Sequence, residues 1–204
     1  MKEVFINNSL KIIKNYYPEY SNQKLEEIKY GLLGLYLLIT KSIIIFALAL
    51  YMNIFKELLI FTIIYNILRS TSFGMHASKS WICLVSSATI FLLSTYISKT
   101  IIIPINFKII FGIIGIILIY KNSPADTRKK PIINKKRRQI YKIISTIISI
   151  IFVIASILIN NNFLSNTFIL SLIIQCVFTS KTMYKICGET YDNYKNYQLE
   201  NGLN

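Results

Sequence analysis

The chain contains one histidine, and this residue lies seven positions before one of its three cysteines. His76 and Cys83 stand in the stretch RSTSFGMHASKSWIC, residues 69–83. A thiol attacks a carbonyl carbon as its thiolate, so a catalytic cysteine needs a base and a lowered pKa. An imidazole can serve as that base near neutral pH. The pair therefore indicates a candidate nucleophilic site, with His76 as general base and Cys83 as the attacking group.

The seven-residue spacing limits how the two side chains can meet. On a continuous helix they would share a face but lie about 10.5 Å apart along the axis, which is too far for a hydrogen bond. His76 must therefore lie outside the helix that carries Cys83, on a loop that folds back over the start of that helix. Turn-forming and capping residues are available for this loop: Ser70, Thr71, Ser72, Gly74, Ser78 and Ser80.

Each of these residues also has a less specific interpretation. A cysteine in an apolar helix is most often a small buried hydrophobic residue, which fits Cys176 well and stays an alternative for Cys83. A single histidine is more often a satisfied polar group than a catalyst. A predicted helix start and the nearby Arg69 and Lys79 favour a thiolate at Cys83. With one histidine and no paired cysteine spacing, the sequence predicts no metal, no cofactor and no disulfide framework.

The elements that must position these groups are membrane spans. The 204 residues are 53% hydrophobic and only 16% charged, with a mean hydropathy of +0.50, a balance typical of a membrane protein. Six apolar stretches are about long enough to cross a bilayer. We therefore predict an all-α polytopic membrane protein, a single domain over 1–204, with spans near 31–52, 54–70, 80–98, 101–120, 140–160 and 163–183.

The net charge of +14 is explained by the segments that connect the spans. Every second segment is basic, so the positive-inside rule places 1–29, 121–139 and 184–204 in the cytoplasm, together with both termini. The stretch from His76 to Cys83 then lies at the cytoplasmic face. Membrane lipid is an expected partner and nucleic acid is not. Residues 4–17 predict an amphipathic helix that lies on the membrane surface or packs as a short helix.

Two motifs in this order resemble the AgrB family, the membrane cysteine endopeptidases of bacterial peptide quorum sensing. The family pattern around the histidine is roughly R-S-x-x-G-G-x-H-A, with a cysteine seven residues after the histidine. Six residues match it: Arg69, Ser70, Gly74, His76, Ala77 and Cys83. Phe73 replaces the first glycine of the pair. SPADTRKKPI, residues 123–132, resembles the family's proline-rich, lysine-rich cytoplasmic loop, and the resemblance covers essentially the whole chain.

The resemblance implies an endopeptidase of the bacterial plasma membrane, with its active site at the cytoplasmic face. It would remove the acidic C-terminal tail of a propeptide, AgrD, through an acyl thioester on Cys83. An internal cysteine or serine of the propeptide would then close a thiolactone or lactone ring. A homodimer is also implied. The candidate supporting residues of the active site are Arg69, Ser70, Gly74 and Ser80, and the tail is expected to contact Arg128, Lys129 and Lys130.

Several assignments stay open. Retention of the loop and contact with anionic lipid explain the basic run 135–138 better than contact with substrate does. Asn66 or Ser80 could orient the imidazole or form an oxyanion hole. Lys41 could line a peptide site or reach the membrane interface. The alternative functions are a six-helix peptide transporter or export channel without proteolytic activity, with a path marked by Lys41, Pro104 and Lys108, and a membrane scaffold.

Overall fold

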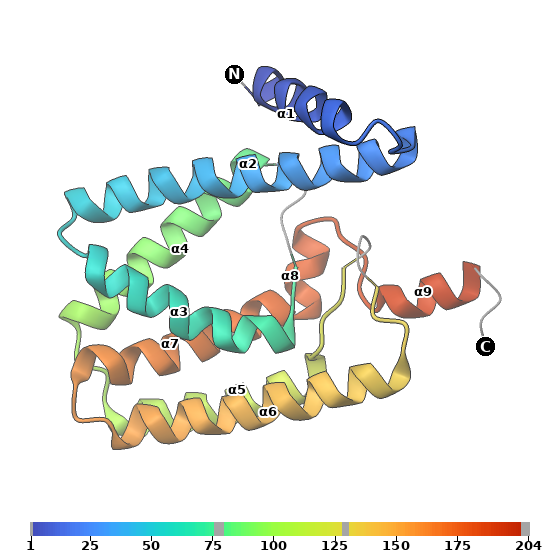
Figure 1. Ribbon diagram of the computed structural model, residues 1–204. Coiled ribbons are helices and arrows are strands. Elements are labelled where there is room, and N and C mark those ends of the chain that lie inside the picture. The colour runs from blue at the N-terminus through green and yellow to red at the C-terminus, as the bar shows by residue number, and fades with distance from the viewer. Residues whose placement is uncertain (1, 76–79, 128–130, 201–204) are drawn as a thin grey trace. The chain divides into compact units, whose positions relative to one another are not determined.

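The computed structural model describes residues 2–75, 80–127 and 131–200, and this part of the chain is almost entirely helical (Figure 1). Its only extended pairing, within those described ranges, is an isolated bridge between Phe73 and Ala125. The all-α class predicted from the sequence is confirmed. The chain divides into two compact units, Met1–Met52 and Asn53–Asn204, which we describe separately.

The first unit consists of α1, Lys2–Tyr16, and α2, Asn22–Tyr51. α1 confirms the helix predicted for residues 4–17, and its Phe5 ring packs against Tyr36 of α2 with 5.6 Å between centroids. The helix that contains the first predicted span begins before residue 31. α2 begins at Asn22, because the Ser21 hydroxyl accepts a hydrogen bond from the backbone N–H of Lys24 and caps the helix. Lys41 lies within this long helix.

The second unit is a bundle in which α7, Asn162–Thr179, packs against the four other long helices of the unit. These are α3 (Phe55–Ser72), α4 (Ser80–Thr100), α5 (Ile105–Asn122) and α6 (Lys135–Leu158). α5 starts later than predicted because Pro104 before it is extended. The sixth predicted span is divided, because Ser180 is extended and starts a separate short helix, α8 (Lys181–Ile186). The described chain ends with α9 (Asn193–Glu200).

Five of the described helices are long and apolar enough to cross a membrane, namely α2, α4, α5, α6 and α7. The predicted second span, α3, is not among them, because its 18 residues include three charged ones, Lys56, Glu57 and Arg69. It still reaches from one end of the bundle to the other. Near its start Glu57 forms an ion pair with Lys99 at 2.7 Å, and after its last turn Phe73 pairs with Ala125. α3 therefore matches the length of the bundle although its sequence is less apolar.

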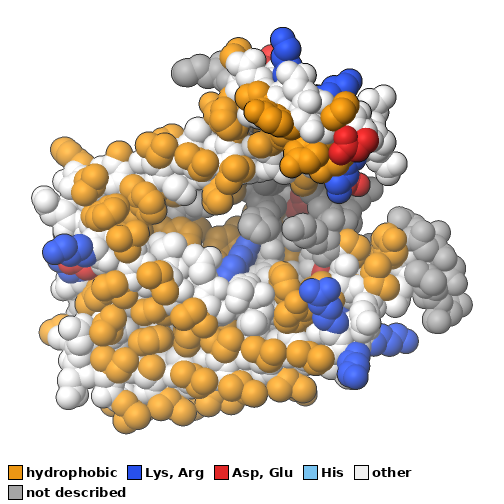
Figure 2. Space-filling view, in the orientation of Figure 1, with side chains coloured by type: hydrophobic (Ala, Val, Ile, Leu, Met, Phe, Trp, Pro, Cys, Tyr) orange, Lys and Arg blue, Asp and Glu red, His pale blue; other side chains and the backbone are white. Residues whose placement is uncertain are grey.

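The polarity of the bundle is the reverse of that in a water-soluble protein. Isoleucines are exposed along α5 and α6, and Figure 2 shows hydrophobic side chains spread over the outer surface. Polar side chains of α7 are at most 2% exposed: Ser165, Asn166, Thr167, Ser171, Gln175 and Thr179. Hydrocarbon surroundings favour this arrangement, because apolar side chains face lipid while polar groups find partners inside. The chain is a membrane protein.

The helices approach closely at glycines of α5. A Cβ added at Gly112 would lie 2.8 Å from Val153 of α6, and one added at Gly115 would lie 2.8 Å from Leu172 of α7. Small residues allow such close contact between membrane helices. Buried apolar residues from α3, α5, α6 and α7 pack around these contacts. The packing holds the helix ends in place, and with them the loops that carry the two motifs.

Candidate active site

The segment 73–75 leads from α3 toward His76 and is not helical. The Gly74 N–H donates to the Ala125 carbonyl at 2.8 Å, and the Met75 N–H donates to a carbonyl in the last turn of α7 at 3.1 Å. His76 itself lies outside the described residues. The expectation that the chain leaves the helix before the histidine is confirmed for these three residues. The predicted loop is wrong for Ser70, Thr71 and Ser72, which lie in the last turn of α3.

Two residues of this segment have positive φ angles, +56° at Phe73 and +123° at Gly74. Phe73 combines its φ with a ψ of −136°, a conformation that residues other than glycine rarely adopt. This gives a physical reason for the glycine that the family pattern has at that position. In this chain the Phe73 ring packs edge-to-face against Tyr141 of α6, with 5.0 Å between centroids.

Two side chains bind carbonyl oxygens of the segment. Arg69 in the last turn of α3 donates through Nη2 to the Met75 carbonyl at 2.8 Å. Gln175 of α7 donates through Nε2 to the Phe73 carbonyl at 2.5 Å. Arg69, a predicted supporting residue, thus holds the backbone directly before the histidine. No sequence motif identified Gln175, although a buried amide within a membrane-spanning helix is itself a signal of a structural or functional role.

The other candidate supporting residues lie apart from these contacts. Ser70 is exposed and its hydroxyl donates to a carbonyl of the preceding turn of α3 at 2.9 Å. Asn66 is also exposed, and its Nδ2 donates to a carbonyl one turn earlier at 2.8 Å. Both side chains therefore satisfy polar groups of their own helix. The side chain of Ser80 lies outside the described part of the chain.

Cys83 lies in the first turn of the described part of α4, as predicted from the sequence. Its free thiol is half-buried, like that of Cys187, whereas Cys176 is buried in the apolar core of the bundle. A partly exposed thiol near the start of a helix can be reached by a substrate, so the position of Cys83 suits a nucleophile. Over residues 2–75, 80–127 and 131–200, no group of three or more His, Cys, Asp and Glu side chains could hold a metal ion.

The basic loop between α5 and α6 lies against the segment 73–75. The Ala125 N–H donates to the carbonyl of the last residue of α3 at 3.0 Å, which completes the bridge to Phe73. A cavity of about 560 Å³ lies between the two segments. It is lined by apolar and charged side chains, among them Arg69, Phe73, Ile132, Ile133, Arg137 and Tyr141. Arg128, Lys129 and Lys130 belong to this loop and lie outside the described residues.

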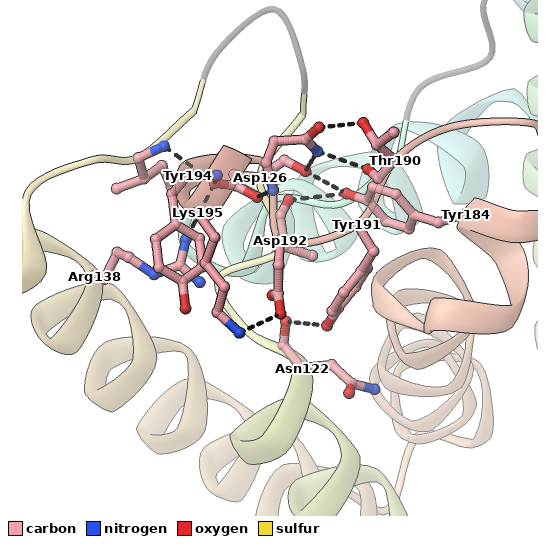
Figure 3. Close-up of polar contacts among 12 residues, drawn as sticks. Asn122, Asp126, Arg138, Tyr184, Thr190, Tyr191, Asp192, Tyr194 and Lys195 are labelled. Carbon is pink, nitrogen blue, oxygen red and sulfur yellow. Dashed lines mark hydrogen bonds and ion pairs between the residues drawn. The ribbon is translucent and has the colours of Figure 1, made fainter. Parts of the chain in front are cut away.

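Asp126, an acidic residue of this loop, binds several of its neighbours through its carboxylate (Figure 3). Its side chain is nearly fully buried, forms an ion pair with Arg138 at 3.1 Å and accepts hydrogen bonds from three backbone N–H groups. Burial raises the pKa of the Asp126 carboxyl, while these donors and Arg138 oppose the rise. Burial also raises the pKa of Tyr184, so its hydroxyl stays protonated and donates to the Asp126 carbonyl at 2.9 Å.

Comparison with known proteins decides the family. The family model described as "Accessory gene regulator B" matches residues 6–179. The chain belongs to the AgrB family. Membership gives it a role in accessory gene regulator quorum sensing. The matched AgrB region includes both motifs and the bridge between them, whereas α8 and α9 follow it.

Relatives of AgrB type align over most of the chain. An AgrB-like protein of Clostridium acetobutylicum is 27% identical over 178 residues, 87% of this chain and 84% of its own length. An AgrB-like protein of Listeria innocua is 28% identical over 174 residues, 84% of each chain. Accessory gene regulator protein B of Staphylococcus carnosus is 33% identical over 113 residues, 55% of this chain and 59% of its own length. No solved structure matches the chain significantly.

Proposed function

We propose that this AgrB family member is a membrane cysteine endopeptidase that removes the C-terminal tail of an AgrD-like propeptide and cyclises the remaining peptide. The observation that carries the proposal is the contact between the two motifs, in which the segment before His76 pairs with the basic loop through Phe73 and Ala125. With Cys83 near the start of α4, this contact supports a base, a nucleophile and cationic side chains acting at one end of the bundle.

In the proposed reaction the His76 imidazole accepts the proton of Cys83, and the thiolate attacks the carbonyl carbon before the tail. The amide C–N bond breaks, the imidazolium gives its proton to the leaving amine, and an acyl thioester remains on Cys83. A thiol or hydroxyl within the propeptide then attacks the thioester carbonyl. The new ring bond forms, the bond to Cys83 breaks, and the proton of the attacking group returns the free thiol.

The energetics require that water be kept from the acyl thioester. Conversion of an amide to a thioester is unfavourable in free energy, whereas exchange between thioesters is nearly balanced. Dissociation of the cleaved tail must therefore shift the equilibrium of the first step toward the acyl thioester. Holding the two ends of a short peptide together supplies a large effective concentration for ring closure. Trp81 and Val85 near the start of α4 are exposed apolar side chains, which supports a site at the membrane edge, where water is scarce.

The cavity beside the segment 73–75 is the proposed binding site for the tail of the propeptide. Arg137 reaches it from the first turn of α6, and its Nε and Nη2 donate to the Tyr141 hydroxyl at 3.2 and 3.0 Å. The guanidinium is thereby held in place, with further N–H groups able to bind a carboxylate. Phe73 and Ile132 supply apolar walls. The cavity therefore suits an acidic peptide segment with apolar neighbours.

Replacing Arg137 with glutamate is expected to raise KM for the propeptide about tenfold or more, because a carboxylate would repel the acidic tail. The change in kcat should be small, since Arg137 is not assigned a role in bond breaking. The measurement is the initial rate of tail cleavage by the full-length protein in liposomes. Lys136→Glu is the matched control, because Lys136 is exposed and is not among the residues that line the cavity. An equal rise in KM in both variants would contradict binding of the tail in the cavity and would favour contact of the loop with lipid.

The wild-type protein is expected to release a cyclic peptide, lighter by one water than the linear product of hydrolysis, because the ring closes on the acyl thioester. Mass spectrometry of the products from reconstituted protein and propeptide measures this. A propeptide whose internal cysteine or serine is replaced by alanine is the control, and it should give the linear product only. Linear product alone from the unaltered propeptide would show that the cyclising step is wrong.

We further propose that this end of the bundle faces the cytoplasm. Cationic side chains gather there: Lys121, Lys135, Arg138, Lys142 and Lys181 line a second, smaller cavity beside the basic loop. At the other end, Lys99 is paired with Glu57. The positive-inside rule favours the more basic end on the cytoplasmic side.

A further inference from the structure

Asp126 joins three parts of the chain through one buried carboxylate (Figure 3). Its Oδ2 accepts hydrogen bonds from Nη1 of Arg138 at 3.1 Å and from the backbone N–H groups of Tyr194 at 3.0 Å and Ile132 at 3.3 Å. Its Oδ1 accepts one from the Asn193 N–H at 3.1 Å. The donors belong to the basic loop, to α6 and to the start of α9. A buried carboxylate with this many donors holds all of them in place.

The segment that follows α7 also holds the basic loop by its backbone. The Tyr184 hydroxyl donates to the carbonyls of Ala125 at 3.1 Å and Asp126 at 2.9 Å. Nδ2 of Asn193 donates to the Asp126 carbonyl at 3.3 Å. We call Tyr184, Asn193 and Tyr194 the C-terminal clamp, because they bind both the side chain and the main chain of Asp126.

The clamped residues form one wall of the proposed substrate cavity. The hydrogen bond from Ile132 to Asp126 closes the loop on itself, and both residues line the cavity. The opposite wall, at the segment 73–75, has its own bonds to Arg69 and Gln175. Loosening of Asp126 would therefore change the loop wall, while Arg69 and Gln175 would continue to hold the segment before His76.

We infer that Asp126 is a positioning residue for the basic loop and that the C-terminal clamp acts through it to set the shape of the substrate cavity. The inference rests on the proposed function, because the molecule that would fill the cavity is the propeptide. The competing interpretation is a buried ion pair of structural importance only, which buried ion pairs often are. A positioning residue alters substrate binding but leaves the fold and the nucleophile intact.

Asp126→Asn is expected to raise KM for the propeptide about tenfold while kcat stays within about twofold of wild type. Asparagine keeps the shape of the side chain but removes the charge that pairs with Arg138, and its amide nitrogen replaces one of the two acceptor oxygens. The full-length protein in liposomes is assayed for initial rates of tail cleavage. In parallel, the rate at which iodoacetamide alkylates Cys83 is followed by mass spectrometry of the Cys83 peptide, and it should be unchanged.

Tyr184→Phe tests the clamp without removing a charge. The ring stays, only the hydroxyl that binds Ala125 and Asp126 is lost, and KM is expected to rise about threefold or more. Asp192→Asn is the matched control, because Asp192 pairs with Lys195 in the same segment and asparagine is tolerated at its φ of +56°. This control should keep the wild-type KM.

An unchanged KM in both Asp126→Asn and Tyr184→Phe would overturn the inference. Faster alkylation of Cys83 in Asp126→Asn would also overturn it, because it would mean that the bundle as a whole had loosened. Cys83→Ala is included in the same assay. Cleavage that survives in Cys83→Ala would contradict the proposed function. If Cys83→Ala loses cleavage while Asp126→Asn and Tyr184→Phe keep the wild-type KM, only the role of the C-terminal clamp is contradicted.

Discussion

Replacing Cys83 with alanine is expected to abolish tail cleavage, lowering kcat by about 10³-fold or more. Alanine lacks the sulfur that carries the acyl group, so neither the thioester nor the ring can form. Cys83→Ser should be nearly as inactive, because a hydroxyl ionises far less readily than a thiol next to the same base. His76→Ala should match them, since the thiol then loses its base. The measurement is tail cleavage by full-length variants whose membrane insertion has been verified.

The other two cysteines supply matched controls. Cys176 packs in the apolar core of the bundle, so Cys176→Ala removes packing and costs stability rather than chemistry. Cys187 follows α8 and is half-buried. Both alanine variants are expected to cleave the tail at close to the wild-type rate. Equal cleavage in Cys83→Ala, Cys83→Ser and both controls would exclude the cysteine endopeptidase.

Replacing Gly74 with alanine is expected to lower kcat/KM by about 100-fold. A Cβ at Gly74 would lie 2.7 Å from Nη1 of Arg69 and 2.9 Å from the carbonyl oxygen of Phe178, and the φ of +123° is one that alanine rarely adopts. The segment would have to move away from α7, which breaks the bond of the Met75 N–H and displaces the backbone that leads to His76. A misplacement of about 1 Å can cost about 100-fold in rate.

Gly34→Ala is the control for this prediction. A Cβ at Gly34 meets no atom within 4 Å, and Gly34 lies inside α2, where alanine is the better helix former. Its cleavage rate should equal that of the wild type, measured in the same liposome assay. A Gly74→Ala protein with wild-type kcat/KM would show that the geometry of the segment before His76 does not limit the reaction.

Local chemistry explains which helices could be predicted. The apolar stretches are long and the connecting segments are charged, so the all-α membrane class and the helical segments follow from composition and hydropathy alone. The errors fall at helix ends, where single residues decide. Ser21 caps α2 ahead of its apolar run, Pro104 delays α5, and an extended Ser180 separates α8 from α7. Hydropathy averages over many residues and does not register such caps.

The departure from the family pattern at Phe73 is explained only by the backbone conformation. The sequence shows only that a glycine of the family pattern is missing there. The positive φ explains why the family pattern has glycine at this position, and the packing of the ring on Tyr141 shows how this chain places a large side chain at the same position.

The sequence by itself determined the membrane class, the helical segments and the residue types of the two motifs, since these are local properties. Only the tertiary structure decided which residues meet. Gln175 binds the Phe73 carbonyl across 102 positions of the chain, and Asp126 binds Tyr194 across 68. No periodicity or spacing encodes such pairs. They arise because close packing of α3, α5, α6 and α7 brings the ends of distant helices together, and the loops at those ends then satisfy each other's polar groups.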